Sequence, residues 1–166
     1  MSAPDFDFYF KRYVDLVPEG PIVAVMDESL LKTVGFLNTI SEDQANSRYE
    51  EGKWLLKEVV GHMIDTERVF AYRALRFARN DSTDLPGYDE NQFAENSNAA
   101  NRNFQDLIME FANARRSTID LYRSFDDEIM SQGGTANGLE INVGKLGRLI
   151  VGHAMHHRNI ITERYL

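Results

Sequence analysis

Residues 146–161 read Leu-Gly-Arg-Leu-Ile-Val-Gly-His-Ala-Met-His-His-Arg-Asn-Ile-Ile. Apolar residues recur in this stretch with the period of an α-helix. At about 100° per residue, Leu146, Leu149, Ile150 and Ile160 all fall within about 60° of His153. The stretch therefore predicts an amphipathic helix whose apolar face is centred on a histidine.

Two further histidines lie on the same helical stretch. His157 follows His153 by four residues, which places both imidazoles on one face of a helix about one turn apart. On the same wheel His157 lies at about +40° and His156 at about −60°. His157 is nearer the centre of the apolar face, and His156 stays an alternative.

The remaining histidine, His62, belongs to another helical segment, Trp54 to Arg79. It too lies on an apolar face, because Leu55 and Val69 fall within about 20° of it. Buried imidazoles need hydrogen-bond partners or a metal. If the two helices are neighbours, three imidazoles can hold one ion and leave a coordination position open for water or substrate.

The rest of the chain supplies the other helices of a bundle. We expect an all-α protein, a four-helix bundle with a short extra N-terminal helix, in one domain that covers residues 1–166. The long helices are expected at residues 22–40, 54–79, 104–130 and 142–165, with Asn142 as the N-cap of the last. The connections are a break at Leu16–Pro21, a loop with one helical turn at 41–52, an irregular stretch at 80–101 and a hairpin-like turn at 135–141.

Composition narrows the function classes. The chain has 18 basic and 26 acidic residues among 166 and a net charge of −8, which argues against binding to nucleic acid or to anionic membranes. It has no cysteine, so a thiolate metal site is excluded. Asp5 and Asp7 stand where a signal peptide would need positive charge, and no apolar run could span a membrane. We expect a cytoplasmic protein.

Several common catalytic motifs are missing from the sequence. There is no phosphate-binding glycine loop and no Gly-x-Ser-x-Gly elbow, and Ala154 occupies the second position of what would be a His-Glu-x-x-His motif. Paired Glu-x-x-His motifs, which a di-iron site would use, are also missing. A mononuclear site is therefore the better prediction.

The motifs together resemble the DinB/YfiT-like superfamily over about residues 20–166. The resemblance rests on Lys53-Trp54, Glu58 to Arg68, Phe70 to Arg76, Leu85-Pro86-Gly87-Tyr88-Asp89, Gly134 to Gly138, Gly152-His153-x-x-His156-His157 and Glu163 to Leu166. It implies a four-helix bundle, usually a homodimer, with one divalent ion such as nickel or zinc held by His62, His153 and His157. Better-understood relatives transfer or isomerise low-molecular-weight thiol adducts, whereas many members have no assigned substrate.

One departure from the family concerns the catalytic base. Relatives often carry Glu after the first histidine of the last helix, where this chain has Ala154, so no catalytic residue is assigned. Glu67 lies at about 140° from His62 on the helical wheel and points away from the metal. We expect it to take part in the packing of the bundle or to hydrogen-bond to a metal ligand without contacting the metal. Glu58 and Asp65, at about −40° and −60°, are better placed to hold an imidazole N–H or to orient water.

Other residues are candidates for the pocket. Arg73, at about +20° from His62 and three turns along, could bind an anionic group of a substrate. Aromatic residues that could wall a pocket are Trp54, which we expect in the core, Tyr72, Tyr88 and Phe93. Met63 and Met155 are expected to fill gaps in the core. The Asn-rich segment 91–103 is expected to be a solvated loop.

The leading functional hypothesis is a metal-dependent enzyme that activates water or a low-molecular-weight thiol, a hydrolase or a thiol S-transferase acting on a small molecule. The alternative is a non-catalytic, dimeric metal-binding protein with a stress-response or regulatory role, and a third hypothesis is a bundle that binds no metal. An enzyme predicts a solvent-connected cavity with an exchangeable ligand, whereas a binding protein predicts a fourth protein ligand or a sealed site.

Overall fold

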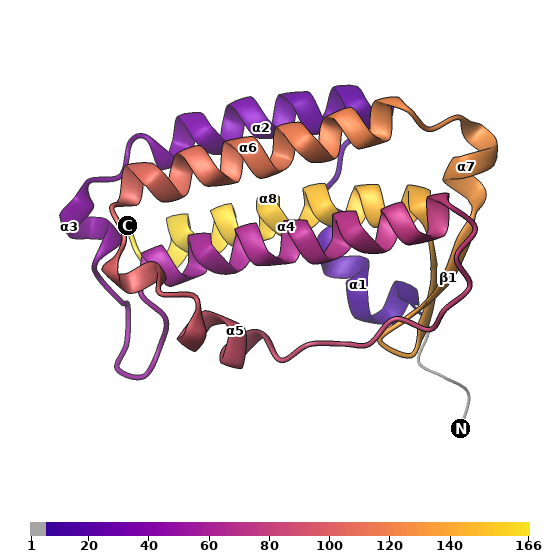
Figure 1. The fold of residues 1–166 in the computed structure, drawn as a ribbon. Coiled ribbons are helices and arrows are strands. Elements are labelled where there is room, and N and C mark those ends of the chain that lie inside the picture. The colour runs from indigo at the N-terminus through magenta and orange to yellow at the C-terminus, as the bar shows by residue number, and fades with distance from the viewer. Residues whose placement is uncertain (1–5) are drawn as a thin grey trace.

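The computed structural model describes residues 6–166 and is built mainly from helices (Figure 1). Asp5, one of the two acidic residues that disfavour a signal peptide, lies outside the described residues. The long helices are α2 (Ile22–Leu37), α4 (Leu56–Ala78), α6 (Phe104–Arg123) and α8 (Val143–Arg164). The shorter elements are α1 (Phe6–Val14), α3 (Glu42–Ala45), α5 (Glu90–Asn96), the 3₁₀ helix η1 (Ala99–Asn101), α7 (Asp127–Ser131) and the strands β1 (Gly133–Ala136) and β2 (Leu139–Asn142).

The four long helices form a bundle in which each packs against two others. Helix α4 contacts α6 and α8, and α2 contacts the same two helices from the opposite corner. Figure 1 shows α2 and α6 as an upper pair and α4 and α8 as a lower pair. Helices α2 and α4 are successive long helices in the sequence and yet lie diagonally across the bundle. The neighbour of α4 on the lower side is therefore the last helix of the chain.

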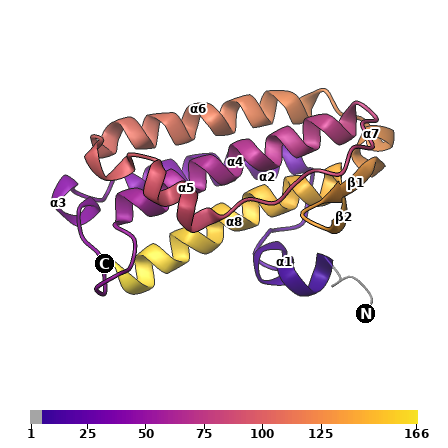
Figure 2. The same ribbon diagram turned by 60° about the horizontal axis from the view of Figure 1, so that its bottom comes forward.

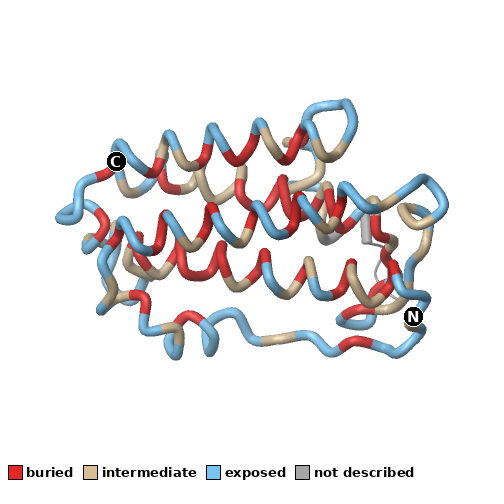
Figure 3. The backbone as a smooth tube through the Cα atoms, turned by 45° about the horizontal axis from the view of Figure 1, so that its top comes forward, coloured by how far each residue is buried: buried red, intermediate tan, exposed pale blue. Residues whose placement is uncertain are grey.

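The bundle buries the apolar face of each helix. Figure 3 shows the buried segments facing the inside of the molecule along all four helices. Fully or nearly fully buried side chains include Met26, Leu37, Val60, Phe77, Leu107, Phe111, Leu146 and Leu149. Removal of this apolar surface from water is the main favourable contribution to folding. Met63 is buried in the same core and Met155 packs against it, as the sequence predicts.

A charged pair lies at the centre of this core. The Arg115 guanidinium, 0% exposed, donates to both carboxylate oxygens of Glu67 at 2.8 and 2.9 Å. It also donates to Ser29 Oγ and to the Ile150 carbonyl oxygen, each at 3.4 Å. These groups belong to α2, α4, α6 and α8, so one guanidinium links all four long helices. Glu67 thus has the packing role predicted from its direction on α4.

Helix α1 lies against α8 next to the last histidines (Figure 2). The close approach depends on Gly152, since a Cβ there would lie 2.1 Å from the Tyr13 carbonyl oxygen. The Tyr13 ring then packs at 5.6 Å from the His153 ring and 5.0 Å from the His156 ring. The short N-terminal helix therefore forms part of the wall around His153.

A small hairpin closes one end of the bundle. Strands β1 and β2 pair antiparallel, and the turn residues Asn137 and Gly138 have φ angles of 51° and 74°, as a tight two-residue turn requires. Leu85 joins this hairpin, because its N–H donates to the Thr135 carbonyl and its own carbonyl accepts from Asn137, both at 2.9 Å. The segment that follows α4 is thereby tied down before it runs back along the bundle.

The structure confirms the fold class and corrects some boundaries. The stretch 80–101, predicted to be irregular, contains α5 and η1. The helix predicted over 104–130 is interrupted, since α6 ends at Arg123 and Asp126 caps α7 by accepting from the Ile129 N–H at 2.9 Å. The helical turn in the loop 41–52, the hairpin and the Asn142 cap are all confirmed.

Candidate metal centre

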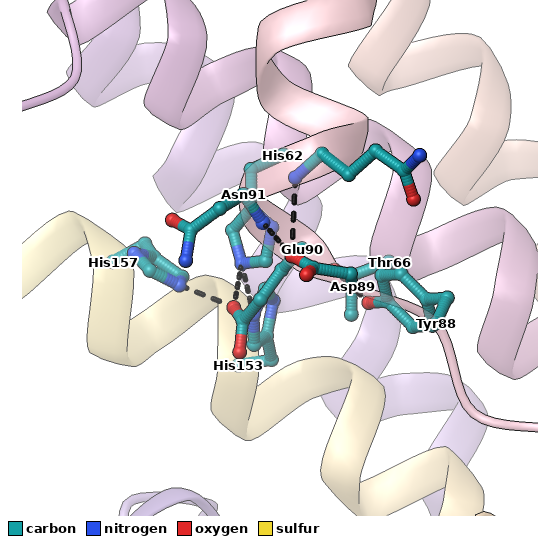
Figure 4. A network of polar contacts seen from close by, with 9 residues as sticks. His62, Thr66, Tyr88, Asp89, Glu90, Asn91, His153 and His157 are labelled. Carbon is teal, nitrogen blue, oxygen red and sulfur yellow. Dashed lines mark hydrogen bonds and ion pairs between the residues drawn. The ribbon is translucent and has the colours of Figure 1, made fainter.

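Three histidines converge between α4 and α8 (Figure 4). His153 Nε2 lies 3.0 Å from His62 Nε2 and 3.1 Å from His157 Nε2. His62 and His153 are 3% and 7% exposed, and His157 is half-buried. The spacing of four residues on α8 and the pairing of α8 with α4 bring these rings together. Within residues 6–166, no other group of three such side chains gathers in this way.

The three imidazoles are in the protonation state that a metal requires. Burial lowers the pKa of His62 from 6.5 to about 4. The pKa values of His153 and His157 lie well below the usual range, chiefly because of burial and then because neighbouring histidines disfavour a positive charge. All three rings are therefore neutral near pH 7, with nitrogen lone pairs free to coordinate.

The two short distances from His153 Nε2 fit a shared ion better than they fit two hydrogen bonds, and all three donor atoms lie within 4.8 Å of one another. One ring nitrogen carries either one N–H or one lone pair, so His153 Nε2 cannot form a full hydrogen bond with both neighbours. Around an ion with metal–nitrogen bonds of about 2.0–2.1 Å, neighbouring ligand nitrogens lie about 2.9–3.4 Å apart. The observed 3.0 and 3.1 Å fall in this range. The donor set present thus fits a transition metal.

The other predicted partners of this cluster lie elsewhere. His156 points to Tyr13 and is not part of the cluster, so His157 is the residue that joins it. Glu58 accepts from the Leu55 N–H at 2.7 Å and thereby caps α4. The prediction that Glu58 holds an imidazole N–H or orients water is therefore wrong. Asp65 is half-buried and lines a surface hollow with Phe93, away from the histidines.

A half-open cavity of about 120 Å³ lies beside His62 and His153. Arg73 reaches it as predicted, at 7% exposure, and donates to the Pro86 carbonyl at 2.9 Å. Burial lowers the pKa of this guanidinium, and no carboxylate pairs with it within the described part of the chain. Further lining residues are Phe10, Tyr13, Thr66, Phe70, Tyr88, Glu90, Asn137 and Leu149. The cavity thus joins the histidine cluster to a buried cation.

The aromatic candidates divide into two groups. Tyr88 lines the cavity and its hydroxyl lies 2.8 Å from Thr66 Oγ1, while Phe93 stacks on Tyr88 at 4.8 Å. Trp54 packs on the core, as predicted, with its ring 5.0 Å from that of His62. Tyr72 is 51% exposed and does not line the cavity. Of these aromatic residues, Tyr88 is the one that lines the cavity beside His62 and His153.

One residue at the site, Glu90, is not indicated by the sequence patterns. A Glu90 carboxylate oxygen lies 3.6 Å from His62 Nε2, and Figure 4 shows this side chain directed toward the histidine cluster. Glu90 is the first residue of α5 and belongs to the stretch 80–101, which the sequence predicts to be irregular. The cap at Asp89, which accepts from the N–H groups of Asn91 and Gln92, was the local signal for this helix.

A larger hollow of about 640 Å³ lies elsewhere, on the surface between α4 and α6. Its walls include Arg68, Asp106, Met109 and Glu110. It contains no imidazole and no cluster suited to a metal among the residues described. The candidate site is therefore the smaller cavity, because the histidine cluster lies there and the larger hollow, as far as the structure describes it, has no metal-binding side chains of this kind.

The bundle and its cluster define a helical protein with a candidate mononuclear metal centre. The family model of the DinB superfamily matches residues 26–161, and the chain belongs to this superfamily. The fold is also similar to that of YfiT from Bacillus subtilis, with a TM-score of 0.74 and 20% identity over 86% of this chain and 82% of that one. YfiT is described as a probable metal-dependent hydrolase with an unusual four-helix bundle topology. No curated protein matches the sequence significantly.

Helix length and hydropathy also bear on the predicted partners. None of the helices in the described part of the chain is both long and apolar enough to cross a membrane.

Proposed function

We propose that this chain is an enzyme that depends on one divalent transition metal, held by His62, His153 and His157. The observation that carries the proposal is the convergence of three neutral Nε2 atoms at 3.0 and 3.1 Å. Three imidazoles suit nickel or zinc better than hard ions such as magnesium. A metal bound there supplies the Lewis acidity that brings the pKa of water or of a thiol close to neutrality.

The cavity supports a catalytic role over a purely binding one. It lies directly beside two of the three ligands and is open on one side, so a substrate can reach them. Its volume of about 120 Å³ corresponds to only about four water molecules. We infer that the cavity holds the reacting end of a small molecule, either a low-molecular-weight thiol for transfer or an ester or amide for hydrolysis.

Arg73 extends this proposal to the charge of the substrate. A buried guanidinium without a carboxylate partner is costly, and a bound anion would offset that cost. The guanidinium can form two parallel hydrogen bonds to a carboxylate. We therefore propose that the substrate carries an anionic group that Arg73 binds. The homodimer and the cytoplasmic location stay predictions.

Metal content tests the first part of the proposal. The protein is purified without a histidine tag, and its metals are measured by plasma mass spectrometry before and after reconstitution with nickel, zinc or manganese. We expect about one metal per chain, lost in His153→Ala. His156→Ala is the matched control, because His156 lies on the same helix outside the cluster, and it should retain the metal. A native protein that takes up none of the three metals would refute the proposal.

Anion binding tests the role of Arg73. Calorimetric titration of the metal-loaded protein with small carboxylates should give a measurable affinity that Arg73→Met abolishes. Arg79→Met removes an exposed arginine near the end of the same helix and should leave that affinity unchanged. Equal affinities in the two variants would contradict the assignment.

A further inference from the structure

Glu90 is the acidic residue closest to the histidine cluster in the described structure. Its Oε2 lies 3.6 Å from His62 Nε2, close to the separation of about 2.9–3.4 Å expected between two ligands of one ion. The side chain is 63% exposed and projects from the first turn of α5. A small rotation would bring the carboxylate within reach of an ion held by the three imidazoles.

The position of Glu90 is determined by contacts on both sides of it. Tyr88 is held by Thr66, which lies one helical turn after His62 on α4, with 2.8 Å between the two hydroxyl oxygens. Asp89 caps α5 by accepting from the N–H groups of Asn91 and Gln92 at 2.9 and 3.1 Å. These contacts fix the backbone of Glu90 against α4 beside His62. The side chain is therefore directed at the cluster by structure that precedes any ligand.

The positive charge expected at the cavity also favours an anionic side chain beside His62. A divalent ion among three neutral imidazoles, together with Arg73, would leave three positive charges beside one small cavity. Among the side chains that the structure describes, Glu90 is the only acid that lines it. A carboxylate next to the ion reduces the cost of burying that charge.

The Glu90 carboxylate oxygen and His62 Nε2 lie 3.6 Å apart, which is longer than a good hydrogen bond. A cation between the two groups would bind both of them. The same cation would also satisfy His153 and His157, which gather at the same place.

We propose that Glu90 is a fourth, exchangeable ligand of the metal, which substrates or other anions displace from the side of the cavity. The proposal rests on the metal site put forward above and adds a residue from α5 to it. An exposed carboxylate on a short helix can leave the ion at little cost to the fold. The three histidines, which come from long bundle helices, stay in place.

Cobalt(II) serves as the probe, since its visible spectrum reports both binding and coordination number. The metal-free protein is titrated with cobalt, and Glu90→Gln is compared with Glu95→Gln, an exposed residue of the same helix that lies outside the cavity. We expect Glu90→Gln to bind cobalt at least about tenfold more weakly, the smallest effect typical of losing even an outer partner of a metal ligand. We also expect its spectrum to change, while Glu95→Gln matches the native protein.

Azide, added to the cobalt-loaded proteins, tests the exchange. Glu90→Gln should bind azide more tightly than the native protein, because no carboxylate competes for the position. Unchanged cobalt affinity, spectrum and azide affinity in Glu90→Gln would overturn this proposal while the three-histidine site stands. A native protein that binds no cobalt at all would overturn the metal site itself and this proposal with it.

Discussion

Replacement of Glu67 by Gln should be among the most destabilising changes that leave the volume of the core unaltered. The substitution keeps the size of the side chain and removes its charge, which leaves the Arg115 guanidinium uncompensated at 0% exposure. Loss of one partner from a buried ion pair costs about 3–5 kcal/mol. A domain is stable by only about 5–15 kcal/mol, so this change removes a large share of the free energy of unfolding.

Urea unfolding followed by far-ultraviolet circular dichroism measures this effect. With a slope of about 2 kcal/mol per molar urea, the midpoint should fall by roughly 2 M. The matched control is Glu110→Gln, because Glu110 pairs with Arg68 and Arg102 near the surface, at 2.7 and 2.5 Å. That change should cost less than about 1 kcal/mol.

A double variant separates the unpaired charge from other causes. Glu67→Leu combined with Arg115→Met removes both charges and should be more stable than Glu67→Gln, since apolar replacements of a buried pair are often neutral or stabilising. A cost for Glu67→Gln no larger than that for Glu110→Gln would refute the predicted penalty of the unpaired Arg115 charge. A double variant no more stable than Glu67→Gln would refute it as well.

Three further predictions concern the site and its helices. Burial lowers the pKa of His62 from 6.5 to about 4, so the unfolded chain takes up this proton at a higher pH than the folded protein does. The free energy of unfolding of the metal-free protein should therefore fall by up to about 3 kcal/mol as the pH is lowered from 6.5 to about 4. Thermal melts at successive pH values measure this loss, and His62→Gln should show a flatter profile. Gly152→Ala should cost about 1–3 kcal/mol and loosen α1, because the new Cβ would meet the Tyr13 carbonyl, and hydrogen exchange along α1 reports the change. Asn142→Ala removes the side chain that accepts from the Lys145 N–H at 2.8 Å and should lower the free energy of unfolding by about 1 kcal/mol in chemical denaturation.

The helical positions of the clustered histidines could be predicted because they follow from periodicity alone. His62 and His153 each lie on the apolar face of a long amphipathic helix, and such faces meet in a bundle. Glu67 was placed correctly in the same way, since its direction on α4 pointed away from His62. Inferences of this kind require only the geometry of one helix and the rule that apolar faces are buried.

The contribution of α5 could not be read from periodicity. Glu90 lies in a polar, Asn-rich segment whose course depends on the contact of Tyr88 with Thr66 and of Leu85 with the hairpin. The break after α6 was missed for a related reason, because Phe125 and Ile129 continue the apolar period across it and pack against the core. Glu58 shows what a helical wheel does not predict. Its direction on α4 is close to that of His62, but it lies in the first turn of the helix, where its carboxylate accepts from the Leu55 N–H as a cap.

The cavity is lined partly by residues of the long bundle helices and partly by residues of the segment between α4 and α6, and these two groups differ in how readily they can change during evolution. His62 and His153 stand on helices whose packing holds the whole molecule together, so substitutions around them are constrained by folding. Tyr88 and Glu90 stand on a connecting segment, where changes in length and sequence are tolerated more readily. If the proposed function holds, new substrate preferences can therefore arise in that segment while the helices that carry the histidines are inherited unchanged.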